Sequence, residues 1–133
     1  MASDLSSPET ALMALEDAYS RKDLEAAVAA KDFRYEAHAM LRALKNLPSP
    51  DEALVRQATE VLERSFRKQM STQGFPDFTG LRCAVIKKTQ IRSDLVEMVE
   101  ECIFRDGRKS TDVLHAALGV KGWRIVVLPR SKS

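Results

Sequence analysis

The sequence lacks the features that would assign it to several broad classes of protein. No apolar run is long enough to cross a bilayer, and the first residues, Met-Ala-Ser-Asp-Leu-Ser-Ser, do not form a basic and apolar leader. The five glycines fall in predicted turns or at predicted strand ends, so none belongs to a glycine-rich phosphate-binding loop. We therefore expect a cytoplasmic protein that has no contact with a membrane.

Cysteine and histidine are scarce, with two residues of each. Cys83 and Cys102 lie within apolar patterns typical of strands, and neither has a second cysteine or a histidine at a spacing typical of a metal site. His38 and His115 have no partner in the sequence that would indicate a metal ligand or a nucleophilic triad. The sequence therefore predicts two buried free thiols, no metal and no cofactor.

A large excess of one charge is also missing, because the formal net charge is only +2. Residues 1–80 hold 10 basic and 13 acidic side chains, which gives −3, and residues 81–133 hold 11 and 6, which gives +5. A nucleic-acid surface would interleave aromatic residues with the basic residues of the second half. These basic residues are instead scattered over predicted strand ends, turns and the tail. We interpret them as solvated edges and do not expect a nucleic-acid partner.

The first half of the chain carries signals for a series of helices. Ser7 and Pro8 predict a helix start, as N-cap and first helical residue, and Asp23 predicts the cap of a second, short helix. Apolar residues at helical spacing predict two further helices over residues 33–46 and 49–71.

The second half carries long runs of β-branched, aromatic and other apolar residues, separated by short turn signals. This pattern predicts an antiparallel β-meander over residues 81–129. We therefore expect a single α+β domain over residues 1–133. Its N-terminal helical layer, residues 7–73, packs on a curved antiparallel sheet formed by the C-terminal half.

The pair Asp106-Gly107 is typical of a two-residue type I′ turn, in which Arg105 would face Arg108. In that register both faces of the sheet carry apolar side chains, although the helices can cover only one face. We predict that a second copy of the chain covers the outer face and forms a homodimer. The alternative is a curled sheet whose outer face is apolar without a partner. The candidate residues of the dimer face are Val96, Met98, Val113, His115, Ala117, Val126 and Leu128.

The same register places three acidic side chains on the face toward the helices. Glu101 would lie opposite Asp112, with Glu97 on the same face, and two opposed carboxylates on a part-buried face can raise a pKa. Tyr19 lies on the apolar stripe of the first helix, and Trp123 begins the last strand. These five residues are our candidates for lining a pocket. The alternative is that the acids lie beyond the helices and face water, and that Trp123 only packs the end of the domain.

Three segments resemble the nuclear-transport-factor-2-like superfamily. The opening Ser7-Pro8-Glu9-Thr10-Ala11-Leu12 with Ala18 is similar to its first helix, and Lys22-Asp23-Leu24-Glu25-Ala26-Ala27 is similar to the start of its second. Lys121-Gly122-Trp123-Arg124-Ile125 is similar to its last hairpin. The resemblance implies a cone-shaped α+β fold with a pocket between sheet and helices, and dimers through the outer sheet face.

The helices expected over residues 33–46 and 49–71 depart from this superfamily, whose members commonly have a short strand pair before a single helix. The superfamily includes ketosteroid isomerases, polyketide cyclases, dehydratases, transport adaptors, ligand-binding accessory domains and immunity proteins of bacterial toxin systems. The resemblance therefore implies a range of functions, and the fold alone does not select one.

Two functions from different classes remain open. The first, which we favour, is a non-catalytic homodimeric module that recognises a protein partner or a small apolar ligand, in an immunity or accessory role. The second is a cofactor-free isomerase or lyase of ketosteroid-isomerase or polyketide-cyclase type, with a carboxylate in the cone pocket. A roomy pocket lined by Tyr19, Glu97 and Asp112 would favour the enzyme. An interior filled by aromatic and methionine side chains would oppose it; the candidates for that filling are Phe33, Phe66, Met70 and Phe75.

Overall fold

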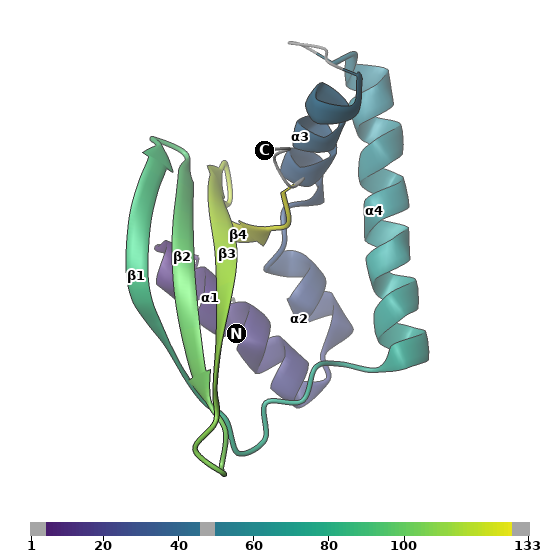
Figure 1. Cartoon of the computed structure of the whole chain (residues 1–133). Coiled ribbons are helices and arrows are strands. Elements are labelled where there is room, and N and C mark those ends of the chain that lie inside the picture. Colours follow the sequence, from purple (N-terminus) through teal and green to yellow (C-terminus); the bar gives the residue numbers. More distant parts are fainter. Residues whose placement is uncertain (1–4, 46–49, 129–133) are drawn as a thin grey trace.

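The computed structural model describes residues 5–45 and 50–128, and it confirms the predicted α+β fold. Four helices precede four strands (Figure 1). The helices are α1 Pro8–Arg21, α2 Leu24–Ala29, α3 Phe33–Lys45 and α4 Glu52–Gln73, and the strands are β1 Arg82–Arg92, β2 Leu95–Ile103, β3 Lys109–Gly119 and β4 Gly122–Val126. None of the helices in the described ranges is both long enough and apolar enough to span a membrane. The predicted elements extended over residues 46, 49 and 129, which lie outside the described ranges.

The first two helices start where the sequence predicts them. The Ser7 hydroxyl accepts a hydrogen bond from the Thr10 N–H at 3.1 Å, and the Thr10 hydroxyl accepts one from the Ser7 N–H at 3.0 Å. This capping box satisfies donors that the first turn of α1 would otherwise leave unpaired. Asp23 caps α2 through a hydrogen bond from the Ala26 N–H. The helix predicted from residue 49 begins instead at Glu52, and Asp51 is its N-cap.

The sheet has the strand order β1-β2-β3-β4, and α1 crosses one of its faces (Figure 1). Leu12 and Leu15 of α1 belong to the same buried cluster as Val96 and Met98 of β2 and Ile125 of β4. Small residues on the helices allow this close packing, because they are fully buried without filling much space. They are Ala11, Ala18, Ala27 and Ala30.

Helices α3 and α4 pack on each other beside the β4 edge of the sheet and do not lie across its face (Figure 1). The residues before α3 join this edge as a short parallel bridge, in which the Asp32 N–H donates to the Ile125 carbonyl and the Ile125 N–H donates to the Ala30 carbonyl. This bridge fixes the start of α3 against β4. The helix pair has a small buried cluster of its own, formed by Ala37, Leu41 and Val55.

The turn between β2 and β3 differs from the prediction. The Phe104 N–H donates to the Arg108 carbonyl, and the Gly107 N–H donates to the Phe104 carbonyl, so the loop has three residues in place of two. Gly107 adopts a φ of 88°, which suits a three-residue loop with a glycine bulge. The extra loop residue shifts β2 by one position against β3, so that Ile103 pairs with Lys109.

A shift by one residue exchanges the two faces of a strand. Val96 and Met98 therefore face the helices and are only 2% and 0% exposed, so their prediction as dimer-face residues was wrong. Glu97 and Glu101 point to the outer face, so their prediction as helix-facing residues was also wrong.

The connection between β3 and β4 also differs from the prediction, but this difference leaves the faces of β4 unchanged. Gly119 pairs with Gly122, so the loop residues are Val120 and Lys121, and the pairing is displaced by two positions from the predicted register. A displacement by two residues preserves the faces of a strand. Ile125 accordingly faces the helices, and Val126 lies on the other face, as predicted.

The two cysteines are not free thiols. Cys83 of β1 lies directly opposite Cys102 of β2, with 4.0 Å between the Cα atoms, and the two side chains form a disulfide. The prediction failed because an apolar strand pattern shows that a cysteine is buried but not which residue it faces across the sheet.

Candidate functional site

Two carboxyl groups meet between α1 and the sheet. Glu16 lies four residues after Leu12, at the border of the buried stripe of α1, and Glu100 projects from the helix-facing side of β2 with only 5% of its surface exposed. The two side chains are hydrogen-bonded to each other. Burial and this contact with Glu100 raise the pKa of Glu16 to about 8, so that Glu16 keeps its proton at neutral pH.

The surroundings of this carboxyl pair contain further acidic and sulfur groups. Asp112 lies opposite Glu100 on β3, and the disulfide lies next to Glu100 on the same face. A carboxylate oxygen of Glu100 and the sulfur atoms of Cys83 and Cys102 all lie within 4.8 Å of one another. No lysine, arginine or histidine of the described residues forms a salt bridge with either acid of the pair.

A second buried charge cluster lies where α3 meets β4. The Lys31 ammonium contacts the Glu36 carboxylate at 2.8 Å, and only 7% and 8% of these side chains are exposed. The Lys31 ammonium also lies over the rings of Phe33 and Phe66, at 5.5 and 5.6 Å from the ring centres. Glu36 accepts a second hydrogen bond from the backbone N–H of Val127. This cluster ties the helix pair to the sheet and is fully occupied by its own contacts.

A pocket with aromatic walls lies at the C-terminal end of α1. Tyr19 contributes one wall, and its ring lies parallel to Phe78 at 6.3 Å and tilted to Phe75 at 6.2 Å. The volume is about 490 Å³, and the remaining lining comes from the end of α1 and the loop between α4 and β1. These other lining residues are Ser20, Lys22, Gly74, Pro76, Asp77 and Thr79.

Local hydrogen bonds hold the loop that forms this pocket. Asp77 accepts from the Thr79 N–H at 2.9 Å, and the Leu81 N–H donates to the Phe78 carbonyl at 3.0 Å. Burial, with a smaller effect from the Glu36 charge, raises the pKa of Tyr19, so that its hydroxyl stays neutral. The pocket therefore offers neutral ring faces with a polar rim.

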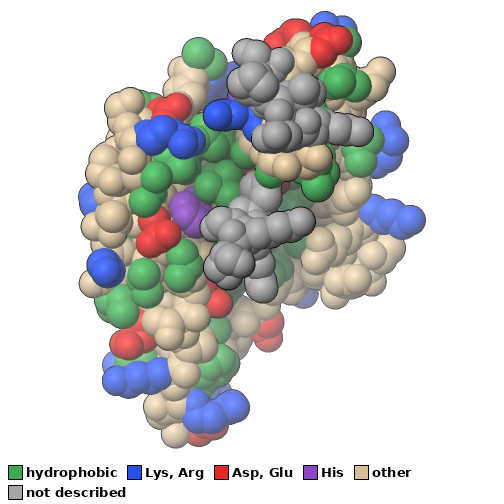
Figure 2. Space-filling model, turned by 45° about the horizontal axis from the view of Figure 1, so that its top comes forward, with side chains coloured by type: hydrophobic (Ala, Val, Ile, Leu, Met, Phe, Trp, Pro, Cys, Tyr) green, Lys and Arg blue, Asp and Glu red, His purple; other side chains and the backbone are tan. Residues whose placement is uncertain are grey.

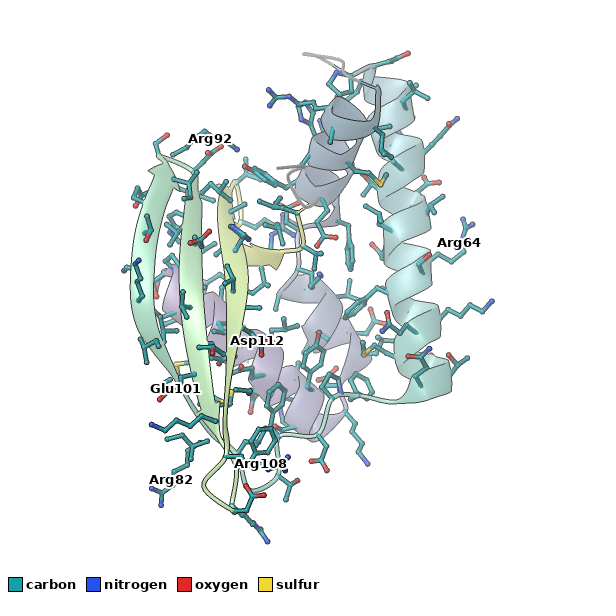
Figure 3. The ribbon with its side chains drawn as sticks, viewed as in Figure 1. Arg64, Arg82, Arg92, Glu101, Arg108 and Asp112 are labelled. Atoms are coloured by element: carbon teal, nitrogen blue, oxygen red, sulfur yellow. A yellow bond between two sulfur atoms is a disulfide. The ribbon has the colours of Figure 1, made fainter. Side chains whose placement is uncertain are left out.

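The structure brings only one of the five predicted pocket residues into this pocket, namely Tyr19. Glu97 and Glu101 lie on the outer face, and Asp112 is exposed at the position opposite Glu100. Figure 3 shows Glu101 and Asp112 on neighbouring strands of the sheet. Trp123 packs at the edge of the main core, where its backbone N–H donates to the Leu5 carbonyl.

The sequence reasoning missed Glu16 and Glu100, although signals for both exist. Glu16 is an acidic residue at helical spacing from the buried Leu12, which indicates a position at the edge of the core. The opposed acid pair that the sequence suggested at Glu101 and Asp112 occurs instead at Glu100 and Asp112, because of the one-residue shift of β2.

The outer face of the sheet carries hydrophobic side chains among charged ones (Figure 2). Val113 is 59% exposed there, and His115 approaches Glu97 at 3.5 Å. Near the β4 edge the face is covered by the chain itself: Leu95, Ala117 and Val126 form a buried cluster with Tyr35 and Leu128 packed against it. The predicted dimer-face residues are therefore divided between the open part of this face, its covered edge and the core.

The labelled arginines lie far apart on the molecule. Figure 3 shows Arg82 and Arg108 at one end of the sheet, Arg92 at the other end, and Arg64 on the side of α4 that faces away from the sheet. These four basic side chains do not form one continuous surface.

No protein-family model matches this sequence, and no curated protein matches it. Solved structures do resemble its fold. A protein of Thiobacillus denitrificans described as a calcium/calmodulin-dependent protein kinase type II association domain has a TM-score of 0.54 and 12% identity, over 92% of both chains.

Two further structures have lower TM-scores. An NTF2-like transpeptidase of Campylobacter jejuni has a TM-score of 0.46 and 16% identity over 92% of this chain and 99% of its own. An NTF-2 like protein of Shewanella oneidensis has a TM-score of 0.47 and 16% identity, over 88% of this chain and 89% of its own. At such identities the comparison concerns the fold alone. This chain thus shares its overall fold with the Thiobacillus denitrificans protein, and its described middle segment is helical.

Proposed function

We propose that this chain is a non-catalytic binding module that takes a small, apolar, ring-shaped ligand in the pocket lined by Tyr19, Phe75 and Phe78. The pocket is the observation that carries this proposal. Its volume of about 490 Å³ falls within the range of small-molecule sites, and ring faces with a few polar groups at the rim are typical of such sites. Neither Glu16 nor Glu100 lines it.

The packing of the interior also supports a binding role over catalysis. Phe33 and Phe66 contact each other with 5.4 Å between ring centres, and Met70 is 7% exposed. The Phe33 and Phe66 rings lie beside Lys31. The acids that an isomerase would place in the cone, Glu97 and Asp112, do not meet there.

Fluorescence titration with 2-naphthol tests the pocket. A compound of this size that fits the site is expected to bind with a dissociation constant on the order of 1 mM or below. Phe78→Ala removes one wall and should raise that constant about tenfold. Phe104→Ala is the matched control, because Phe104 lies in the β2–β3 turn against Arg108. Equal binding by both variants, or none by the parent chain, would refute the pocket as the ligand site.

We further propose that the chain acts as a homodimer through the open part of the outer sheet face. Val113 is 59% exposed on this face, which leaves apolar surface without a cover. Glu101 lies on the same face as Lys87 and Lys109, so a two-fold axis can pair opposite charges across the interface. The face thus suits a second copy of itself.

Light scattering of the parent chain, Val113→Glu and Val61→Glu tests the dimer. Val61 is an exposed valine of α4, so its variant controls for the added charge. We expect a dimeric parent, a monomeric Val113→Glu that keeps its circular dichroism, and a dimeric Val61→Glu. A monomeric parent would refute the dimer and leave this face as a candidate surface for a different protein partner.

One observation favours the alternative, a cofactor-free isomerase or lyase. The pKa of Glu16 is raised to about 8, which suits a general acid at neutral pH. Conversion of 3-cyclohexenone to its conjugated isomer, followed by absorbance, tests this function. Turnover that Glu16→Gln and Glu100→Gln abolish would establish the enzyme, whereas a rate equal to that of buffer would leave the binding module as the function.

A further inference from the structure

Side chains with metal-ligand atoms converge beside the carboxyl pair. Cys83 lies opposite Cys102, and Glu100 precedes Cys102 by two residues, so all three project from the helix-facing side of the sheet. Their sulfur and oxygen atoms lie within 4.8 Å of one another, and Glu16 of α1 is hydrogen-bonded to Glu100. Glu100 and Cys102 are each only 5% exposed. Two strands thus supply three potential ligands to one buried point, and Glu16 of α1 lies beside them.

No basic side chain of residues 5–45 and 50–128 forms a salt bridge with Glu16 or Glu100. The carboxyl oxygens at this point are therefore not taken up by a cation of the described chain, and carboxylate oxygens can serve as metal ligands.

The disulfide blocks such a site in the oxidised chain, because its sulfur atoms carry no negative charge for a metal. Two thiolates and carboxylates are a ligand set that suits zinc, which prefers four ligands in a tetrahedron. The Cα atoms of Cys83 and Cys102 are 4.0 Å apart, so both side chains leave the sheet side by side. Thiolates bound to one zinc ion lie roughly 3.8 Å apart, given Zn–S distances of about 2.3 Å. After reduction, the sulfur atoms of Cys83 and Cys102 can reach this separation.

We propose that the reduced chain binds one zinc ion between β1, β2 and α1, with Cys83, Cys102 and Glu100 as ligands and a water molecule as the fourth. A dithiol such as dithiothreitol gives two electrons to the disulfide and becomes a cyclic disulfide, while Cys83 and Cys102 each gain a proton. Zinc then replaces these two thiol protons, which pass to the solvent. The disulfide and the metal exclude each other, so the redox state of the chain selects one of them.

Cobalt(II) is the spectroscopic probe for this site. The full chain is reduced with dithiothreitol, desalted without oxygen and titrated with cobalt(II). We expect a near-ultraviolet band from thiolate to cobalt and the visible bands of a tetrahedral ion, both saturating at one ion per chain and lost when zinc is added. The oxidised chain should show neither band.

Variants identify the ligands. Cys102→Ser should lose the thiolate band of the intact site, and Glu100→Gln should weaken binding at least tenfold. Glu60→Gln is the matched control, because Glu60 is an exposed acid of α4, which supplies no ligand to this site, and it should leave binding unchanged. Equal weakening by both glutamine variants would overturn the assignment of Glu100.

Circular dichroism shows whether reduction unfolds the chain, so that the metal site can be tested in that case as well. In that case cobalt or zinc should restore the folded spectrum, because the energy of metal binding contributes to folding. The absence of a thiolate band in a reduced chain, whether folded or unfolded, would overturn the proposal. A band of equal strength in the oxidised chain would do the same.

Discussion

Replacement of Glu36 by glutamine should destabilise the protein strongly. The carboxylate of Glu36 is the partner of Lys31 at 2.8 Å, with 8% and 7% of the two side chains exposed. Glutamine has nearly the same shape but no charge, so Glu36→Gln leaves the Lys31 ammonium buried without its counter-ion. Loss of one partner of a buried ion pair costs about 3–5 kcal/mol.

Two contacts place the expected loss at the lower end of that range. The Lys31 ammonium keeps its contacts with the Phe33 and Phe66 rings, and each such contact contributes about 0.5–2 kcal/mol. The glutamine oxygen can still accept the hydrogen bond from the Val127 N–H. We therefore expect a loss of about 3 kcal/mol. In a chain of 133 residues this corresponds to a fall in melting temperature of about 10 °C.

Urea unfolding and thermal melts followed by circular dichroism measure this loss. Glu52→Gln is the matched control, because the pair of Glu52 with Arg34 is 63% and 58% exposed and should contribute less than about 1 kcal/mol. A double replacement, Lys31→Met with Glu36→Met, should recover most of the stability, since no charge then stays buried. If Glu36→Gln and Glu52→Gln lost the same free energy, the interior at Lys31 would be hydrated and the reasoning would be refuted.

Three further predictions concern the sheet and its contact with α1. The pKa of Glu16 is raised from 4.5 to about 8, so the folded chain binds this proton more tightly than the unfolded chain between those pH values. In the presence of a chelator the free energy of unfolding should fall as pH rises from 5 to 8, by up to about 1 kcal/mol per pH unit, and urea titrations should show that Glu16→Gln removes this slope. Reduction of the Cys83–Cys102 disulfide, which joins residues 19 apart, should lower the free energy of unfolding by about 3 kcal/mol in a metal-free urea titration, and an unchanged midpoint would contradict it. Gly107→Val should cost about 1–3 kcal/mol in thermal melts, because the φ of 88° is strained for a β-branched residue, whereas Gly107→Asn should cost less.

Local signals in the sequence were sufficient for the helices. The caps at Ser7 and Asp23 form as predicted because a side-chain oxygen and the backbone donors it satisfies lie within one turn of each other. Gly74 ends α4 with a φ of 84°, a backbone conformation that glycine adopts without strain. Such contacts depend on neighbours in the sequence, so the rest of the chain does not alter them. The disulfide depends on residues 19 apart, and no local pattern specifies that pairing.

The hairpin between β2 and β3 shows why the site was harder to predict. Asp106-Gly107 supplies a residue with positive φ, but two-residue and three-residue loops both use one. The sequence therefore located the turn and left the register uncertain by one residue. That one residue decides which acid of β2 faces α1, so the error moved the predicted site from Glu100 to Glu97 and Glu101.

The charges of β2 explain why the observed register is the stable one. Both faces of the strand carry apolar residues, so hydrophobic burial alone does not choose between them. The register predicted from the turn would place Glu97 and Glu101 against α1, whereas the observed register buries only Glu100, which meets the proton-bearing Glu16. Burial of one carboxylate with a hydrogen-bonded partner is less costly than burial of two without one. Glu16 of α1 therefore helps to fix the register between β2 and β3, and this register brings Glu100 next to Glu16.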